Sequence, residues 1–359
     1  MTSRCWCGNS ELDHFSPAYL RCQRCETLVA AIMPAPDQLL VTDDDYGFYS
    51  RAYFEEYQVN NLGLPPITER ARTDLHDRCI HWLRTFLRYK LPPARTIEIG
   101  SSHGAFVGLL RWSGFDAAGL ELSPWIAKFA RTIFGVPVFR GPVEGQPFER
   151  GSYDAVILMD VLEHLPDPLL TIRRCVEILK PGGIVLIQTP AYREGKTLAQ
   201  MEAGDDPFMK MLLPEQHLYL FSPTSVCRLL AEAGAGHVCF ERAAFNQYDM
   251  FLVAGRRPQS KLDDREVHAA LVGSPSGRLV GLILDLDSRL AELGAMYAES
   301  EADRAARLAV IEEQAAALSR AEGDRNRLDA ELHALRARFE AAEADRAARL
   351  AVIEEQAAA

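Results

Sequence analysis

The chain has 359 residues, of which 48% are hydrophobic and 25% are charged, and its net charge is −11. This composition is ordinary for a globular protein; it excludes a fully disordered or collagen-like chain, and the length predicts two or three domains of about 150 residues. The acidic balance argues against binding of nucleic acid through bulk positive charge. There is no run of about 18 apolar residues and no apolar signal core, so we expect no transmembrane segment and a cytoplasmic location.

Four cysteines crowd the first 25 residues, in the order C-x-C, fourteen other residues, and C-x-x-C. Two cysteine pairs on two turns can present four thiolates to one Zn²⁺ as a tetrahedron, whereas disulfides are rare in the cytosol. We therefore predict a structural zinc site in a small zinc-ribbon-like module over residues 1–40, with redox-active or unliganded cysteines as the alternative. The predicted ligands are Cys5, Cys7, Cys22 and Cys25.

Aromatic side chains recur through residues 41–73, which we expect to form a helical connector. Tyr49, Tyr53 and Tyr57 are spaced at i, i+4 and i+8 and so share one helical face. Tyr46 and Phe54 belong to the same run. One interpretation is a lid over a binding site, and the other is a helix that packs the cysteine module onto the next domain.

Strand and helix patterns alternate over residues 74–256. The alternation predicts a doubly wound, Rossmann-like α/β fold with a seven-stranded sheet, in which the last two strands form an antiparallel edge pair. Ligands of such sheets bind at the carboxyl ends of the strands. The expected strands are residues 96–99, 117–121, 136–139, 153–159, 184–188, 238–240 and 250–254, and the expected helices are residues 74–89, 105–113, 124–134, 168–179 and 222–233.

The first two expected strands end in residues suited to a nucleoside. The first runs through Glu98 into Gly100, and a glycine directly after a strand lets the backbone approach a ligand closely. The second ends in Glu121, about 20 residues further on, where a carboxylate can accept hydrogen bonds from both ribose hydroxyls. The loop lacks the G-x-G-x-x-G spacing of a dinucleotide site, so we expect a different ribonucleoside.

From about residue 46 to residue 256 the chain resembles the class I S-adenosylmethionine-dependent methyltransferases. The family's first motif is an acidic residue followed by spaced glycines, and here Ser102 stands at the middle glycine. Glu121 matches the ribose-binding acid, and Leu179-Lys-Pro-Gly-Gly183 matches a characteristic segment before the fifth strand. The matching segments are residues 98–104, 121, 141–148, 153–168, 179–183 and 216–223.

The resemblance implies a site for S-adenosylmethionine and transfer of its methyl group by in-line displacement, in which the protein mainly aligns the reactants. A hydroxyl acceptor usually needs a base, so His164 and His217 are the catalytic candidates. In the alternative interpretation, His164 caps a turn and His217 fixes a loop through the backbone. The implied cofactor-binding residues are Glu98, Gly100, Ser101, Ser102, His103, Gly104, Glu121, Leu122, Val143, Glu144, Met159 and Asp160.

A zinc-ribbon-like module on this type of methyltransferase resembles enzymes of sugar, polysaccharide and secondary-metabolite pathways. The implied substrate is a small molecule or glycan, first a hydroxyl or amine of a sugar, nucleotide-sugar or glycan end, and then other small metabolites. The alternative function is a catalytically weak or inactive scaffold that works through its C-terminal helix. Ser102 and Pro142 depart from the family pattern and favour the scaffold, whereas Gly100, Gly104 and Glu121 favour the enzyme.

The C-terminal part of the chain is a separate kind of sequence. Residues 301–317 recur letter for letter at residues 343–359, and this offset of 42 residues preserves heptad phase. We expect residues 257–277 to be a linker and residues 278–359 to form a coiled coil that joins copies of this chain or a coiled-coil partner. The alternative is a single solvated helix held by i,i+4 charge pairs.

Overall fold

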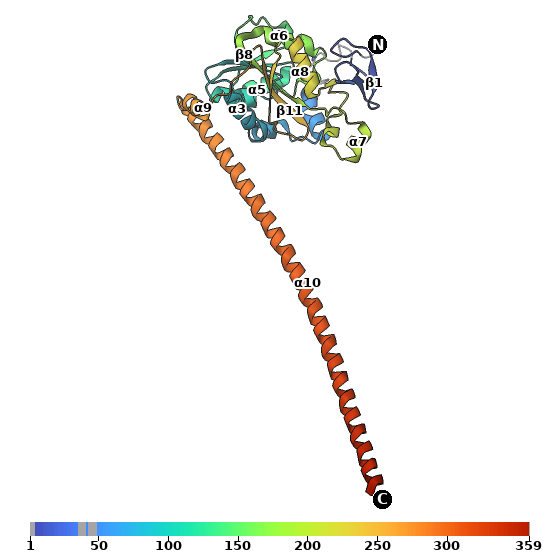
Figure 1. Ribbon diagram of the computed structural model, residues 1–359. Helices are drawn as coiled ribbons and strands as arrows, with labels where there is room; N and C mark the ends of the chain where they lie inside the picture. Colours follow the sequence, from blue (N-terminus) through green and yellow to red (C-terminus); the bar gives the residue numbers. More distant parts are fainter. Residues whose placement is uncertain (1–3, 35–40, 42–48, 359) are drawn as a thin grey trace. The chain divides into compact units, whose positions relative to one another are not determined.

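The computed structural model describes residues 4–34, 41 and 49–358. Its centre is a seven-stranded sheet with the order β10-β11-β8-β7-β4-β5-β6, as predicted for the α/β fold (Figure 1). Strand β11 is antiparallel to both of its neighbours, and the remaining neighbours are parallel. The strands are β4 (Arg95–Ile99), β5 (Asp116–Glu121), β6 (Val138–Arg140), β7 (Tyr153–Met159), β8 (Leu179–Pro190), β10 (His237–Glu241) and β11 (Asp249–Gly255).

Helices cover both faces of this sheet because its central strands are apolar on both sides. Val156 and Val185 face a core shared with α6 and α8, while Ile157 and Ile184 face a core shared with α3, α4 and α5. Each fully buried side chain of this size contributes about 1.5–3 kcal/mol. The helices are α2 (Ile67–Asp74), the π-helical turn η3 (Leu75–Cys79), α3 (Ile80–Leu87), α4 (Ala105–Trp112), α5 (Pro124–Phe134), α6 (Pro168–Ile178) and α8 (Pro223–Glu232).

Four of the five predicted helices agree closely with these bounds. The helix predicted at residues 74–89 instead begins at Ile67, directly after Pro66, and contains the π-helical turn η3 before it ends at Leu87. Two strands also differ from the prediction. Strand β6 begins at Val138 rather than at residue 136, because Pro137 has no N–H to donate to the ladder. Strand β8, predicted to begin at residue 184, already begins at Leu179. Helix α8 begins after Ser222, which caps it through a reciprocal capping box with Ser225.

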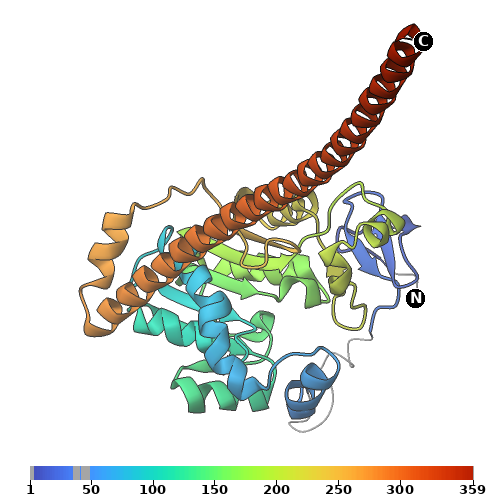
Figure 2. The ribbon, with the colours of Figure 1, turned by 90° about the horizontal axis from the view of Figure 1, so that it is seen from below.

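The cysteine-rich segment forms three short antiparallel strands, β1 (Leu12–His14), β2 (Tyr19–Cys22) and β3 (Leu28–Ala30). Strand β3 also pairs with β9 (Tyr219–Leu220), so the cysteine-rich segment shares a sheet with the methyltransferase-like region. Figure 2 shows these N-terminal strands in blue beside the yellow-green segments near β9. The remaining short helices are η2 (Tyr53–Tyr57), α1 (Gln58–Asn60), η4 (Val143–Gly145), η5 (Leu162–His164), α7 (Leu198–Ala203) and η6 (Pro207–Met211).

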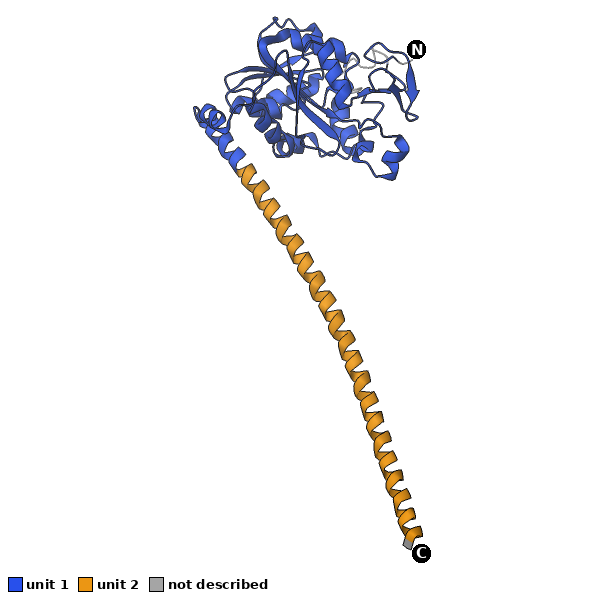
Figure 3. Ribbon diagram, viewed as in Figure 1, with its two compact units in different colours: residues 1–285 blue, residues 286–359 orange. Residues whose placement is uncertain are grey.

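The chain divides into two compact units, Met1–Asp285 and Leu286–Ala359 (Figure 3). The stretch expected as a linker, residues 257–277, instead contains helix α9 (Asp264–Leu271), and Leu271 is buried in the core of the first unit. Helix α10 (Pro275–Ala358) begins in that unit, where Val280 and Leu284 are buried, and makes up the whole of the second unit. None of the helices within the described residues is both long and apolar enough to cross a membrane.

Candidate active site

The loop after β4 is built from residues with left-handed backbone. Gly100 has φ of +68°, and an added Cβ would lie 2.6 Å from Val161 Cγ2. Gly104, which precedes α4, has φ of +82°, and its Cβ would lie 2.9 Å from Ala130 Cβ. Only glycine fits at either position. Ser102, between them, takes φ of +45° despite its side chain.

Glu121 lies at the carboxyl end of β5, opposite this loop. Its Oε2 accepts the backbone N–H of Ser102 at 2.9 Å, and its Oε1 accepts those of Leu122 at 2.7 Å and Ser123 at 3.1 Å. Burial raises the pKa of Glu121, and these three amides oppose that rise. A carboxylate offers about four lone-pair positions, so Glu121, which accepts three amides, retains about one position for a ribose hydroxyl.

Two polar atoms, one near the end of β4 and one in the loop after it, are buried without a hydrogen-bond partner in the described part of the chain. They are Oε2 of Glu98 and Oγ of Ser101. Burial raises the pKa of Glu98, with Glu121 adding to the effect. Unsatisfied buried polar atoms are costly, so a ligand with hydrogen-bonding groups fits this cradle. S-adenosylmethionine, with its ribose hydroxyls and ammonium group, is a ligand of that chemistry.

The predicted cofactor-binding residues Val143, Glu144 and Met159 have different surroundings. Gly141 donates its backbone N–H to the carbonyl of Glu121 at 3.0 Å, which holds the loop after β6 against the end of β5. Val143 is buried next to it. Glu144 accepts the hydroxyl of Thr171 on α6, so its carboxylate is engaged within the protein. Met159, at the end of β7, is 7% exposed and packs into the core.

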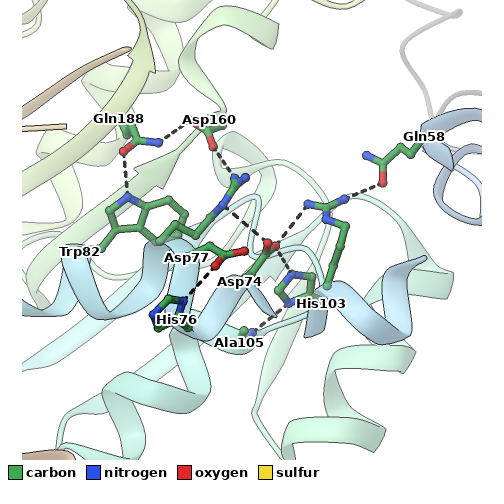
Figure 4. Close-up of polar contacts among 11 residues, drawn as sticks. Gln58, Asp74, His76, Asp77, Trp82, His103, Ala105, Asp160 and Gln188 are labelled. Carbon is green, nitrogen blue, oxygen red and sulfur yellow. Dashed lines mark hydrogen bonds and ion pairs between the residues drawn. The ribbon is translucent and has the colours of Figure 1, made fainter. Parts of the chain in front are cut away.

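Asp160, the residue after β7, has φ of +55° and carries a polar network that Figure 4 shows. Its carboxylate accepts a hydrogen bond from Arg78 at 3.1 Å and another from Gln188 at 3.0 Å. Gln188 in turn accepts the indole N–H of Trp82 at 2.9 Å. The strained backbone of Asp160 is therefore held in place by β8 and by the helices before the sheet.

Asp74 joins the same network from helix α2. The ring of His103 donates from Nε2 to Asp74 at 2.8 Å and accepts the N–H of Ala105 at Nδ1, so both ring nitrogens of this predicted cofactor contact are engaged within the protein. Burial raises the pKa of Asp74, but the His103 hydrogen bond and the charges of Arg78 and Arg70 outweigh burial and hold it below its usual value. No sequence motif pointed to Asp74, Arg70 or Arg78.

The two catalytic candidates lie side by side, with ring centroids 5.0 Å apart. His164, in η5, donates from Nδ1 to the carbonyl of Gln216 at 2.8 Å, and His217 donates from Nδ1 to the carbonyl of Met211 at 2.7 Å. Burial lowers the pKa of both imidazoles, that of His217 to about 3. Both rings are therefore neutral at pH 7, with an Nε2 lone pair that is not used by the backbone.

The described residues of the aromatic segment pack beside α5 and the carboxyl end of the sheet. Phe54 is buried against Ile126, and its ring stacks on Trp125 of α5 at 6.0 Å. Tyr49 lies with its ring centroid 6.4 Å from that of His164. These contacts favour the interpretation of this segment as a lid over a binding site, and not as a helix that packs the cysteine module onto the next domain. Tyr46, from the same predicted run, lies outside the described residues.

The four N-terminal cysteines converge as predicted. Their sulfur atoms all lie within 4.8 Å of one another, with Cys5 and Cys25 at 3.4 Å and Cys7 and Cys22 at 3.6 Å. These are free thiols rather than disulfides. A tetrahedral zinc site with Zn–S bonds of about 2.3 Å has sulfur–sulfur distances of about 3.8 Å, so the cluster is compatible with Zn²⁺.

Comparison with known proteins identifies the class to which this fold and site belong. The family model described as "Methyltransferase domain" matches residues 71–238. The ubiquinone biosynthesis O-methyltransferase of Bordetella avium is 30% identical over 163 residues, which cover 43% of this chain and 67% of the relative. The chain belongs to the class I S-adenosylmethionine-dependent methyltransferases.

Other similarities are more limited in extent. The ubiquinone biosynthesis O-methyltransferase of Xanthomonas campestris pv. campestris is 36% identical over 138 residues, or 37% of this chain, and the match spans only 57% of that relative's length. A solved structure from Thermotoga maritima, a possible histamine N-methyltransferase, matches with a TM-score of 0.40 and 20% identity, and covers 53% of this chain and 96% of its own. The names of these relatives give no support to the expected link with polysaccharide biosynthesis.

Proposed function

We propose that this protein transfers a methyl group from S-adenosylmethionine to a hydroxyl of a small molecule. The observation that carries the proposal is the cradle of Gly100, Gly104 and Glu121, where two left-handed glycines bring backbone close to a buried carboxylate that keeps about one free acceptor position. Glu121 would hold the ribose hydroxyls, and Glu98 and Ser101 would bind polar groups of the cofactor's methionine part. When bound, the cofactor supplies a sulfonium whose methyl group is activated for displacement.

The acceptor would bind beneath the aromatic lid. A pocket of about 500 Å³ is lined by Tyr53, Tyr57, Asn60, Asn61 and Gln216, among others. Gln216 ties this pocket to the histidine pair, because its amide bonds the hydroxyls of Tyr53 and Tyr57 and its backbone carbonyl accepts the ring N–H of His164. An acceptor hydroxyl near the pair could donate its hydrogen bond to either Nε2, which would hold the oxygen in line with the methyl group.

Aromatic rings beside amide and carboxylate groups suit a polyhydroxylated acceptor, so a sugar or nucleotide-sugar remains our first choice of substrate. The named relatives supply a second choice, an aromatic hydroxyl, because they are O-methyltransferases of ubiquinone biosynthesis. The acidic Glu56 and Glu215 at the pocket favour a neutral sugar over a nucleotide-sugar, because the diphosphate of a nucleotide-sugar is strongly anionic.

A methyl-transfer assay tests the proposal and separates these choices. The purified chain is incubated with S-adenosylmethionine and separate panels of sugars, nucleotide-sugars and catechols, and formation of S-adenosylhomocysteine is followed. Turnover with a sugar is expected. Turnover only with catechols would overturn the sugar assignment, and binding of cofactor without turnover on any panel would favour the scaffold alternative.

We further propose that the cysteine cluster holds a structural Zn²⁺ and that residues 286–359 associate two or more copies of the chain. Support for the first is the spacing of the four sulfurs. Support for the second is a row of exposed apolar side chains at heptad spacing on α10, which includes Ile311 and Leu318, 59% and 62% exposed.

A further inference from the structure

Three side chains beside the cofactor cradle form a cluster with the composition of a metal site. Glu163 and His164 lie in η5, directly after β7, and His217 lies on the segment that leads into β9. One carboxylate oxygen and one ring nitrogen from each histidine lie within 4.8 Å of one another. Nε2 of His164 is 3.8 Å from Oε1 of Glu163.

The hydrogen bonds of the cluster leave its ligand atoms facing one another. Backbone carbonyls can only accept, so the bonds from His164 to Gln216 and from His217 to Met211 place the ring proton on Nδ1 and a lone pair on Nε2. Within the described residues, no donor reaches either Nε2. Metal-binding histidines are typically oriented by such a bond from their other nitrogen.

The carboxylate is oriented in the same way. The hydroxyl of Thr189 donates to Oε2 of Glu163 at 2.9 Å, and Oε1 is the oxygen that faces His164. Glu163 is only 1% exposed, and no lysine or arginine is within ion-pair distance of it among the described residues. A buried carboxylate that faces two imidazole lone pairs lacks a positive partner, and a cation between them would supply it.

The two segments that carry the cluster are fixed to each other. Leu218 donates its backbone N–H to the carbonyl of Glu163 at 2.8 Å, and the hydroxyl of Tyr19 on β2 donates to the carbonyl of His217 at 2.9 Å. Val161, two residues before Glu163, is the residue against which Gly100 packs. The cluster is therefore preorganised and directly adjoins the cofactor loop.

We propose that Glu163, His164 and His217 bind a divalent metal ion. Two imidazoles and one carboxylate form an N₂O set that leaves coordination positions open, and it suits Mn²⁺, Fe²⁺ or Zn²⁺ better than Ca²⁺. The proposal deepens the proposed function, and it assigns these histidines as ligands instead of a base. A bound cation would take the acceptor oxygen as a further ligand and promote loss of its proton to water. That oxygen then bonds the methyl carbon as the carbon–sulfur bond breaks, and the electron pair stays on sulfur.

Manganese binding tests the proposal independently of methyl transfer. Mn²⁺ prefers oxygen and nitrogen ligands to thiolates, so the cysteine cluster does not compete. The full chain is dialysed against a chelator and then against metal-free buffer, and Mn²⁺ is added while the electron paramagnetic resonance signal of the free ion is recorded. One bound Mn²⁺ per chain is expected, and Glu163→Gln and His217→Gln should each weaken it about tenfold or more.

The control is His237→Gln, which changes an exposed histidine on β10 and should leave Mn²⁺ binding unchanged. Equal Mn²⁺ affinity in wild type and both cluster variants, or no binding by wild type, would overturn the proposal. If the variants fail to fold by circular dichroism, an anomalous-scattering peak in Mn²⁺-soaked wild-type crystals decides: a peak among the three side chains supports the site, and a peak only elsewhere overturns it. Failure of the proposed function would instead appear as absent S-adenosylmethionine binding with Mn²⁺ binding intact.

Discussion

At the scale of single residues, the site depends on carboxylates that are held by different partners. Glu121 is held by three backbone amides, whereas Asp74 is held by His103 and two arginines. The sequence pattern was sufficient to predict that Glu121 ends a strand beside the glycine loop, because Glu121 lies at a characteristic distance from Gly100. It was insufficient for Asp74, because the partner of Asp74 lies 29 residues away and the contact depends on how α2 packs against the glycine loop.

Replacing Asp74 should change how the free energy of unfolding depends on pH. The pKa of Asp74 is lower in the folded chain than its usual value of about 4. Its stabilising contribution is therefore present above about pH 4 and is lost as the pH falls through the folded-state pKa. Asp74→Asn should lower the free energy of unfolding at pH 7 by about 1–3 kcal/mol, and urea unfolding should show this difference shrinking below about pH 4.

Asp77, one turn further along the same helical segment, provides the matched control. It is exposed and pairs only with His76 among the described residues. Asp77→Asn should change stability by less than about 0.5 kcal/mol. A difference between wild type and Asp74→Asn that stays constant from pH 7 to pH 3 would contradict the role given to Asp74.

At the scale of elements, the lid and the cysteine strands both bear on the active site. The helical spacing of the tyrosines predicted a helical face but not its contacts, since an aromatic face can pack on any apolar surface. The structure places Phe54 on Trp125, four residues after Glu121, and Tyr57 on the pocket beside Gln216. We therefore expect the two ends of η2 to affect different ligands, the cofactor and the acceptor.

Two substitutions in η2 should separate these ligands. Phe54→Ala removes a buried ring from α5 and should loosen the lid, which we expect to weaken S-adenosylmethionine binding about tenfold in calorimetry. Tyr57→Ala should leave cofactor affinity within about twofold and raise the KM of the acceptor. The reverse pattern, with Tyr57→Ala as the variant that loses cofactor, would contradict the placement of the lid.

Removal of zinc should increase backbone motion at residues 217–221, because the cysteine-rich strands share a sheet with this segment. Strand β3 pairs with β9, and the N–H of Ala30 donates to the carbonyl of Leu218, the residue after His217. Because the cysteines hold the turn before β1 and the turn between β2 and β3, chelation of zinc should loosen this pairing. Hydrogen exchange is expected to speed up at residues 217–221 and to stay slow in β11. Unchanged hydrogen exchange at residues 217–221 would show that the cysteine cluster does not stabilise this part of the active site.

At the scale of the whole molecule, five segments expected from the sequence fall into two compact units. Composition correctly located the change to a proline-free helix, because helix propensity is a local property. The predicted end of the first folded unit, at residue 256, was too early. Composition could not show that Leu271, Val280 and Leu284 are buried in that unit, because burial depends on tertiary packing. The first unit therefore extends to Asp285.

This boundary defines a truncation that tests the role of the second unit. A chain ending at Asp285 keeps the buried turns of α10 and should be a monomer that still binds S-adenosylmethionine. The full chain should be a dimer or larger oligomer, because exposed leucines such as Leu332 and Leu335 gain a partner. Light scattering coupled to size-exclusion chromatography gives both masses, and an oligomer that persists in the truncated chain would contradict the proposal.

The most direct test of the central claim is calorimetric titration of the full chain with S-adenosylmethionine. We expect one cofactor bound per chain, and Glu121→Ala should weaken binding by about 1–3 kcal/mol because a buried charged acceptor is lost. Glu149→Ala, which removes an exposed carboxylate, is the matched control and should bind as wild type does. No binding at millimolar cofactor, or an affinity unchanged by Glu121→Ala, would contradict the account of this site.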